Sequence, residues 1–154
     1  MDKQVLVATI IAQLEKTLQG TTQAALEAAQ SATDDEAKSE SKYDTRGLEA
    51  SYLASGQAHY AKELKEQLDL FRNLKIEQPD PNTPVHLGSL ITTLSAEGRE
   101  RFFMAPAEGG LEIEGSGSTI LVITPKSPIG SAIIGKQIGT QTGGPNSKTI
   151  IGIE

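Results

Sequence analysis

The chain has no cysteine and no tryptophan, and only three tyrosines and three phenylalanines among its 154 residues. Without cysteine, disulfides, thiolate metal sites and thiol catalysis are excluded, and a reducing cytoplasmic location is expected. The scarcity of aromatic residues excludes a binding surface built mainly from large aromatic anchors. No run approaches the roughly 18 apolar residues of a transmembrane helix, so no membrane association is predicted.

Basic charge is also scarce, with 14 Lys and Arg against 20 Asp and Glu, for a net charge of -6. Phosphate binding needs clustered basic residues, so the chain is not expected to bind DNA stably by itself. A partner with a basic cleft is more plausible. The apolar run at 5–12 lacks a cleavage pattern, and its helical pattern continues through Gln13 and Glu15, which argues against a signal peptide.

Two long stretches follow a helical pattern. In residues 3–33, one stripe alternates spacings of four and three: Val7, Ile11, Leu14, Leu18, Thr21, Ala25, Ala28 and Ala32. Residues 46–74 carry a matching stripe: Ala50, Ala54, Gln57, Ala61, Leu64, Leu68 and Phe71. Two such stripes around a polar bend predict a long antiparallel α-hairpin, a coiled coil with arms of about 45 Å.

A coiled-coil hairpin can also hold two protomers together, and this alternative stays open. A dimerising hairpin usually exposes a second apolar stripe. No such stripe is evident in the sequence, so a monomer is expected.

The segment from Gln78 to Pro84 ends the helical pattern. Three prolines in six residues, Pro79, Pro81 and Pro84, favour a stiff extended connection. The predicted domains are therefore a hairpin at 1–75, a Pro-rich linker at 76–84 and a β-rich domain at 85–154.

The β-rich domain contains five short strand-like runs, at 85–94, 101–104, 111–113, 119–124 and 149–153. A helical turn is predicted at 128–134, with Ser127 as its cap and Pro128 at its first position. Short strands with one short helix indicate a small antiparallel sheet. The fold class is therefore α+β.

Two patterns suggest chemistry that the rest of the sequence does not support. Residues 130–136 satisfy the first seven positions of a phosphate-binding loop, but Gln137 replaces the hydroxyl residue that would hold Mg²⁺. A short helix closed by a glycine explains them better. His59 and His86 have no acid or serine at a spacing that predicts a triad, and no zinc-ligand spacing.

The bend is rich in acids. Asp34, Asp35, Glu36, Glu40, Asp44 and Glu49 alternate there with Lys38, Lys42 and Arg46. One interpretation is a solvated loop whose Thr33, Asp34 or Asp44 caps a helix. The other is a set of hard oxygen ligands that holds Mg²⁺ weakly until a partner supplies the remaining ligands. Both stay open on these residues alone.

The segment Ser127-Pro128-Ile129 with Gly135-Lys136, placed after an acidic-tipped hairpin, resembles the bacterial GreA/GreB transcript-cleavage factor family. The resemblance spans nearly the whole chain and is tightest in this segment. It implies an FKBP-like C-terminal domain and a hairpin that enters the secondary channel of RNA polymerase. It also implies that Lys126, Ser127, Pro128 and Ile129 contact the channel rim, although relatives often have Asp or Asn where Lys126 stands.

The family's tip reads Asp-Leu-Lys-Glu-Asn-Ala-Glu-Tyr and aligns with residues 36–43. Glu36 takes the place of the first acid, and Lys38 and Tyr43 match as supporting residues. Ser39 stands where the second acid belongs, with Glu40 one position later, and Asp34, Asp35 and Asp44 are the remaining tip acids.

The resemblance implies no tightly bound cofactor. It implies instead a Mg²⁺ shared by Glu36, Glu40 and the polymerase, which itself cleaves backtracked RNA, so the protein is not expected to be an enzyme. The alternatives are a channel binder without cleavage and a self-associating coiled-coil protein. Prolyl isomerase activity is not expected, because adjacent Phe102 and Phe103 would point to opposite faces of a strand.

Overall fold

The computed structural model describes residues 2–33, 46–78, 82–115, 117–144 and 146–154. They form two compact units, the hairpin unit (Ile10–Asp69) and the sheet unit (Met1–Thr9 with Leu70–Glu154). The unit boundaries fall inside the two long helices. The first residues of one helix, up to Thr9, and the last residues of the other, from Leu70, therefore belong to the sheet unit. The predicted domain ranges of 1–75, 76–84 and 85–154 stay a prediction.

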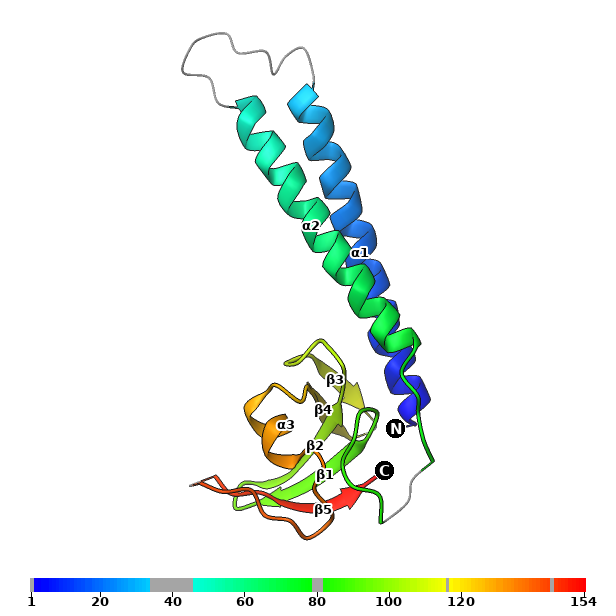
Figure 1. Cartoon of the computed structure of the whole chain (residues 1–154), viewed down its shortest axis with the longest axis vertical. Helices are drawn as coiled ribbons and strands as arrows, with labels where there is room; N and C mark the ends of the chain where they lie inside the picture. Colours follow the sequence, from blue (N-terminus) through cyan, green and yellow to red (C-terminus); the bar gives the residue numbers. More distant parts are fainter. Residues whose placement is uncertain (1, 34–45, 79–81, 116, 145) are drawn as a thin grey trace. The chain divides into compact units, whose positions relative to one another are not determined.

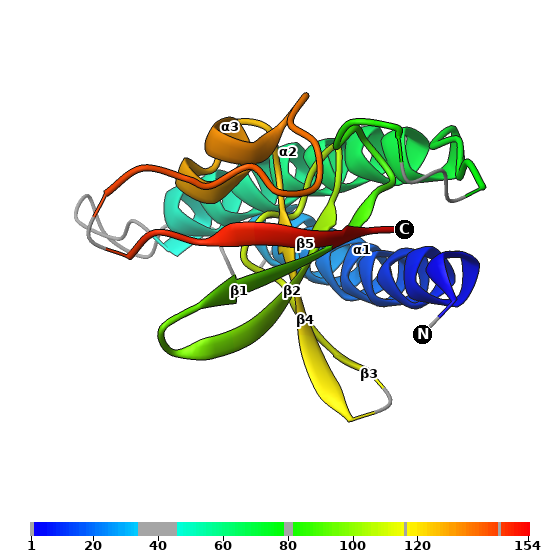
Figure 2. The ribbon, with the colours of Figure 1, turned by 90° about the horizontal axis from the view of Figure 1, so that it is seen from below.

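The predicted helical hairpin is confirmed. α1 (Lys3–Thr33) and α2 (Arg46–Arg72) lie side by side in Figure 1 and Figure 2. Every residue of both predicted stripes is buried or half-buried. Leucines such as Leu14 and Leu64 fill the seam far from the bend, whereas Ala28 and Thr21 near the bend allow the helices to approach closely. α2 ends two residues earlier than predicted, where the Leu74 amide donates to the Phe71 carbonyl.

The α+β class is also confirmed. Five strands form one sheet: β1 (Leu90–Ser95), β2 (Gly98–Met104), β3 (Glu112–Gly115), β4 (Ser118–Ile123) and β5 (Thr149–Ile153). Their order is β3-β4-β2-β1-β5, and the β1–β2, β1–β5 and β3–β4 pairs are antiparallel. The predicted small antiparallel sheet is therefore confirmed as a mostly antiparallel one, with β2–β4 as its one parallel pair among the described strands. β3 comes between β2 and β4 in the chain and runs antiparallel to β4 at the edge of the sheet. The chain therefore reverses direction twice, and β4 runs parallel to β2.

The first strand starts later than predicted. Residues 86–89 form a turn in which the Ser89 amide donates to the His86 carbonyl at 3.1 Å. Gly88 adopts φ +88, and a Cβ there would lie 3.0 Å from the Lys75 carbonyl oxygen. A left-handed backbone at such close approach favours glycine. The strand begins only at Leu90 because residues 86–89 form this turn.

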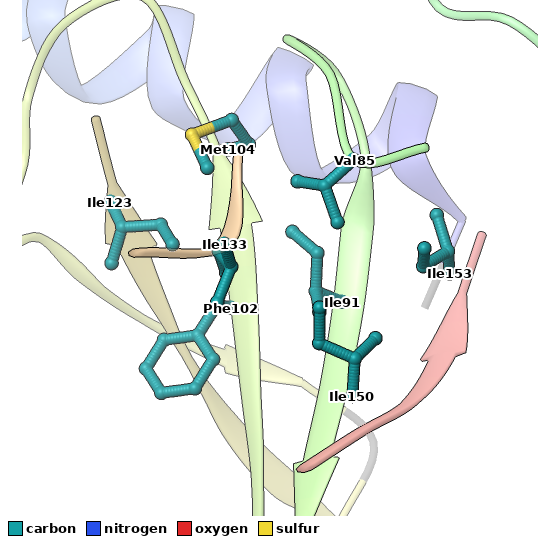
Figure 3. Close-up of a cluster of buried hydrophobic side chains, with 8 residues drawn as sticks. All are labelled: Val85, Ile91, Phe102, Met104, Ile123, Ile133, Ile150 and Ile153. Atoms are coloured by element: carbon teal, nitrogen blue, oxygen red, sulfur yellow. The ribbon is translucent and has the colours of Figure 1, made fainter. Parts of the chain in front are cut away.

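The core of the sheet unit lies against one face of the sheet (Figure 3). It consists of Val85, Ile91, Phe102, Met104, Ile123, Ile133, Ile150 and Ile153. The short helix α3 (Pro128–Ile133) contributes Ile133, which is fully buried. Phe103 is also fully buried but lies outside this cluster, as the two-residue period of a strand requires.

Among the residues that the structure describes, none of the helices has the length and apolar character needed to cross a bilayer.

Candidate functional site

The acidic tip falls outside the residues that the structure describes. The predicted residues in question are Asp34, Asp35, Glu36, Lys38, Glu40, Tyr43 and Asp44. Their proposed roles and the choice between a solvated loop and a metal-binding tip therefore stay predictions. Among the described residues, no group of His, Asp and Glu is arranged to hold a metal ion.

The helix ends on either side of the tip are described. Thr33 ends α1, and its hydroxyl donates to the carbonyls of Ala29 and Gln30 at 3.2 and 3.0 Å. α2 begins at Arg46 and carries Glu49 in its first turn. A carboxylate there is favourable, because the first turn of a helix exposes partial positive charge. The acid-rich segment thus joins two helix ends that lie side by side (Figure 1).

The predicted cap of the short helix is confirmed. Ser127 is the N-cap of α3, with Pro128 in the first turn. The Gly130 amide donates to Ser127 Oγ at 3.1 Å, and Ser127 Oγ donates to the Thr124 carbonyl at 2.8 Å. The serine side chain therefore fixes both the preceding turn and the start of the helix.

The Ser-Pro-Ile segment divides into inward and outward residues. Ile129 is half-buried and packs against the core, whereas Lys126 and Pro128 are exposed. Of the four residues expected to contact a partner, Lys126 and Pro128 therefore offer the accessible side chains. Ser127 and Ile129 hold the segment in place.

The glycines that suggested a phosphate-binding loop have structural roles. Gly130 lies in the first turn of α3, and its amide is already bonded to Ser127. Gly135 adopts φ +72 just after the helix, and its amide donates to the Val85 carbonyl at 2.8 Å. The interpretation as a short helix closed by a glycine is confirmed.

His86 has partners that the sequence spacing did not reveal. Its Nδ1 lies 3.0 Å from the Pro84 carbonyl oxygen and 3.0 Å from Ser89 Oγ, and its Nε2 lies 3.6 Å from the Glu77 carboxylate. These contacts fit the structural role expected of His86. Ser89 is fully buried, which places this cluster in the framework of the fold.

Lys3 and Glu77 join the start of α1 to the segment that follows α2. Lys3 is 9% exposed, and its Nζ donates to the Glu77 carbonyl at 2.7 Å. Burial lowers the pKa of Lys3 below its usual 10.5, against the opposing effects of Glu154, Glu77 and Asp2.

A wide cleft of about 780 Å³ lies in the sheet unit. The β1–β2 and β3–β4 pairs diverge in Figure 2, and β2 pairs with β4 only from Arg101 onward. Within the cleft, Arg101 lies 4.0 Å from Glu154, and Glu100 pairs with Lys148. Phe102 is the one aromatic residue in its lining, whereas a proline-binding pocket needs several aromatic rings.

The chain thus defines a class: a long helical hairpin joined to a small, mostly antiparallel five-stranded sheet with one short helix. No protein-family model and no curated protein matches it.

Among solved structures, the chain is similar to GreA factor homolog 1 (Gfh1) of Thermus thermophilus. The identity is 18% and the TM-score 0.37, over 96% of this chain and 92% of that chain. A structure of the transcription factor Gfh1 gives 22% identity and a TM-score of 0.37, over 94% and 92%. For Thermus aquaticus Gfh1 the identity is 16% and the TM-score 0.35, over 98% of this chain and 93% of that chain. These scores are too low to establish a common fold, so the role of the chain is argued below from its own residues.

Proposed function

We propose that the chain is a GreA/GreB-like regulator of transcription elongation that binds RNA polymerase and presents residues 34–45 in the secondary channel. The observation that carries the proposal is the antiparallel pairing of α1 and α2, whose ends at Thr33 and Arg46 lie side by side. Five of the twelve residues between these ends are acids. A narrow pair of helices is a suitable carrier for carboxylates that act in the active site of another protein.

The donor set of the tip suits Mg²⁺, a hard cation that prefers carboxylate oxygens. In this proposal Glu36 and Glu40 hold the ion together with the polymerase. The ion supplies Lewis-acid stabilisation and activates water for phosphodiester hydrolysis. The chain's own contribution is to position the carboxylates, while the catalytic machinery belongs to the polymerase. Since the proposed partner is a cytoplasmic enzyme, the proposal includes a cytoplasmic location.

The sheet unit contacts the polymerase at the channel rim in this proposal. Lys126, just before the Ser-Pro-Ile segment, and Pro128 within it are exposed, and the Ser127 cap and buried Ile133 fix their positions. The segment is therefore a rigid surface, which binds with little loss of conformational entropy.

A second candidate function is occupation of the channel without cleavage. Ser39 favours it, because a serine stands where the second acid of the family's tip belongs. Displacement by one residue on a helix turns a side chain by about 100°, so Glu40 would face a different direction from the acid it replaces.

The test uses purified core polymerase and a stalled, backtracked complex. The parent is expected to bind the polymerase and shorten the RNA. The variant Asp35→Asn, Glu36→Gln, Glu40→Gln is expected to bind the polymerase. Its RNA cleavage rate is expected to fall by about tenfold or more, because it loses metal ligands. A matched control neutralises Glu63, Glu66 and Glu97, which lie outside the tip.

Each result has one meaning. A triple tip variant that cleaves like the parent shows that the tip chemistry is wrong. Binding of the parent without any RNA shortening supports the second candidate function. Failure of the parent to bind polymerase contradicts both.

A further inference from the structure

Within the two helices of the hairpin unit, the charged residues gather at the end away from the bend. Seven of the 15 residues at 10–16 and 62–69 are charged. Of the 33 residues at 17–33 and 46–61, only Glu27, Arg46 and Glu49 are charged. Because α1 and α2 are antiparallel, the two poorly charged stretches lie alongside one another next to the bend (Figure 1). They are called the neutral half below.

The neutral half also carries exposed apolar side chains. Within the described part of the hairpin unit, the large apolar residues that are exposed all lie there: Leu26 (55%), Leu48 (56%), Tyr52 (71%), Leu53 (56%) and Tyr60 (45%). Four of them belong to α2, although no second apolar stripe is evident in the sequence. Leu48 and Tyr52 are four residues apart and Leu53 and Tyr60 are seven apart, but neither spacing continues to a third exposed apolar residue.

This composition is unusual for a surface that stays in water. A soluble protein surface is ordinarily about 25–35% charged, which keeps copies of the protein apart. Buried protein–protein interfaces are instead depleted in Lys and Glu and enriched in Tyr. The neutral half shares two of these features, the low charge and the exposed tyrosines.

The missing charge is not confined to one face. Both helices present exposed uncharged positions, namely Thr22, Ala29, Gln30 and Ser31 on α1 and Ser51, Ser55 and Ala58 on α2. A helix that docks on one side keeps its charges on the other side. Loss of charge around the whole pair fits enclosure by a partner.

We propose that the channel of the polymerase encloses the neutral half with an uncharged wall, in place of the basic cleft expected from net charge alone, while the charged part of the two helices stays outside. This inference rests on the function proposed above and adds the depth of insertion and the surface that grips the arms. Seventeen residues of α1, at 1.5 Å rise each, give an inserted length of about 25 Å. Tyr52 and Tyr60 add two aromatic contacts to a surface made mainly of small uncharged residues, because their rings bury large apolar areas at a small cost in side-chain entropy.

A second copy of the chain is a poorer occupant of this surface. Pairing through α2 would leave the uncharged positions of α1 in water. Two α2 helices crossing antiparallel at Gly56 would also bring Glu49 of one copy opposite Glu63 of the other, and like charges repel.

The test inserts charge of either sign at matched positions. The Ala29→Lys, Ala58→Lys pair and the Ala29→Glu, Ala58→Glu pair are each expected to weaken binding to core polymerase by about tenfold or more, because a charge must be desolvated. The control pair Ala12→Lys, Gln13→Lys lies in the charged part and is expected to bind like the parent. Circular dichroism checks that each variant keeps its helices.

A second readout is hydroxyl-radical labelling with and without polymerase. Protection of Tyr52 and Tyr60 in the complex, with unchanged labelling of Leu70, supports the inference. Equal polymerase affinity for all three pairs overturns the inference and leaves the proposed function intact. A stable dimer of the parent that Tyr52→Ala, Tyr60→Ala disrupts overturns it in favour of self-association. If the parent does not bind polymerase, the proposed function is wrong and the inference falls with it.

Discussion

Gly130 shows how little freedom the Ser-Pro-Ile segment has. A Cβ at this position would lie 1.9 Å from the Thr124 carbonyl oxygen, far inside van der Waals contact. The same carbonyl already accepts hydrogen bonds from the Ser127 amide and hydroxyl. Residues that look like a binding motif are thus explained largely by the way the chain turns from β4 into α3.

Gly130→Ala is therefore expected to destabilise the sheet unit by about 1–3 kcal/mol, the usual cost of forcing an extra carbon into a packed site. Urea unfolding followed by circular dichroism measures the change. Gly143→Ala is the matched control, because a Cβ there has no atom within 4 Å. Equal midpoints for the two variants would contradict this account of the segment.

At the scale of elements, α1 contains a glycine with no structural reason to be there. Gly20 lies inside the helix, its φ is not positive, and a Cβ would have nothing within 4 Å. Gly20→Ala is expected to raise the free energy of unfolding by about 0.5–1 kcal/mol, because alanine loses less backbone entropy on folding. Urea unfolding followed by the helical circular dichroism signal measures the change. Gly98→Ala, at φ +122, should have the opposite sign. A loss of stability in Gly20→Ala would show that the seam needs this glycine.

Local patterns predicted the elements well, because their causes are local. The seven-residue spacing of Leu14, Thr21 and Ala28 determines which face of α1 is buried, and the Ser127-Pro128 pair sets the start of α3. The parallel β2–β4 pair was missed, since strand direction depends on where β3 lies in the sheet.

The candidate site was predictable only in part, because some of its contacts depend on residues that are distant in the sequence. The contact between Glu77 and His86 was missed, because it joins residues on opposite sides of a proline-rich segment. The exposed tyrosines of α2 were missed because three-dimensional burial, rather than residue type, distinguishes them from seam residues. The tip acids were chosen by resemblance, and their roles stay predictions.

At the scale of the whole molecule, three distant parts of the chain meet within the sheet unit. Lys3 begins α1, Glu77 follows α2, and Glu154 ends the chain. The Lys3–Glu77 hydrogen bond joins the first two, and Glu154 acts electrostatically on Lys3. This junction buries a cation, which couples its stability to pH.

Burial lowers the pKa of Lys3 below 10.5, so the unfolded chain holds this proton more tightly than the folded chain does. Between the two pKa values the unfolded state binds more protons, and the contribution of Lys3 to stability therefore rises with pH. Below both values the full cost of burying the ammonium group is present. The free energy of unfolding of the parent, minus that of Lys3→Met, is thus expected to increase from neutral pH towards pH 10.5. Lys16→Met, at an exposed position, controls for general titration and should show no such trend. A parent-minus-variant difference that stays constant with pH would show that burial does not govern this lysine.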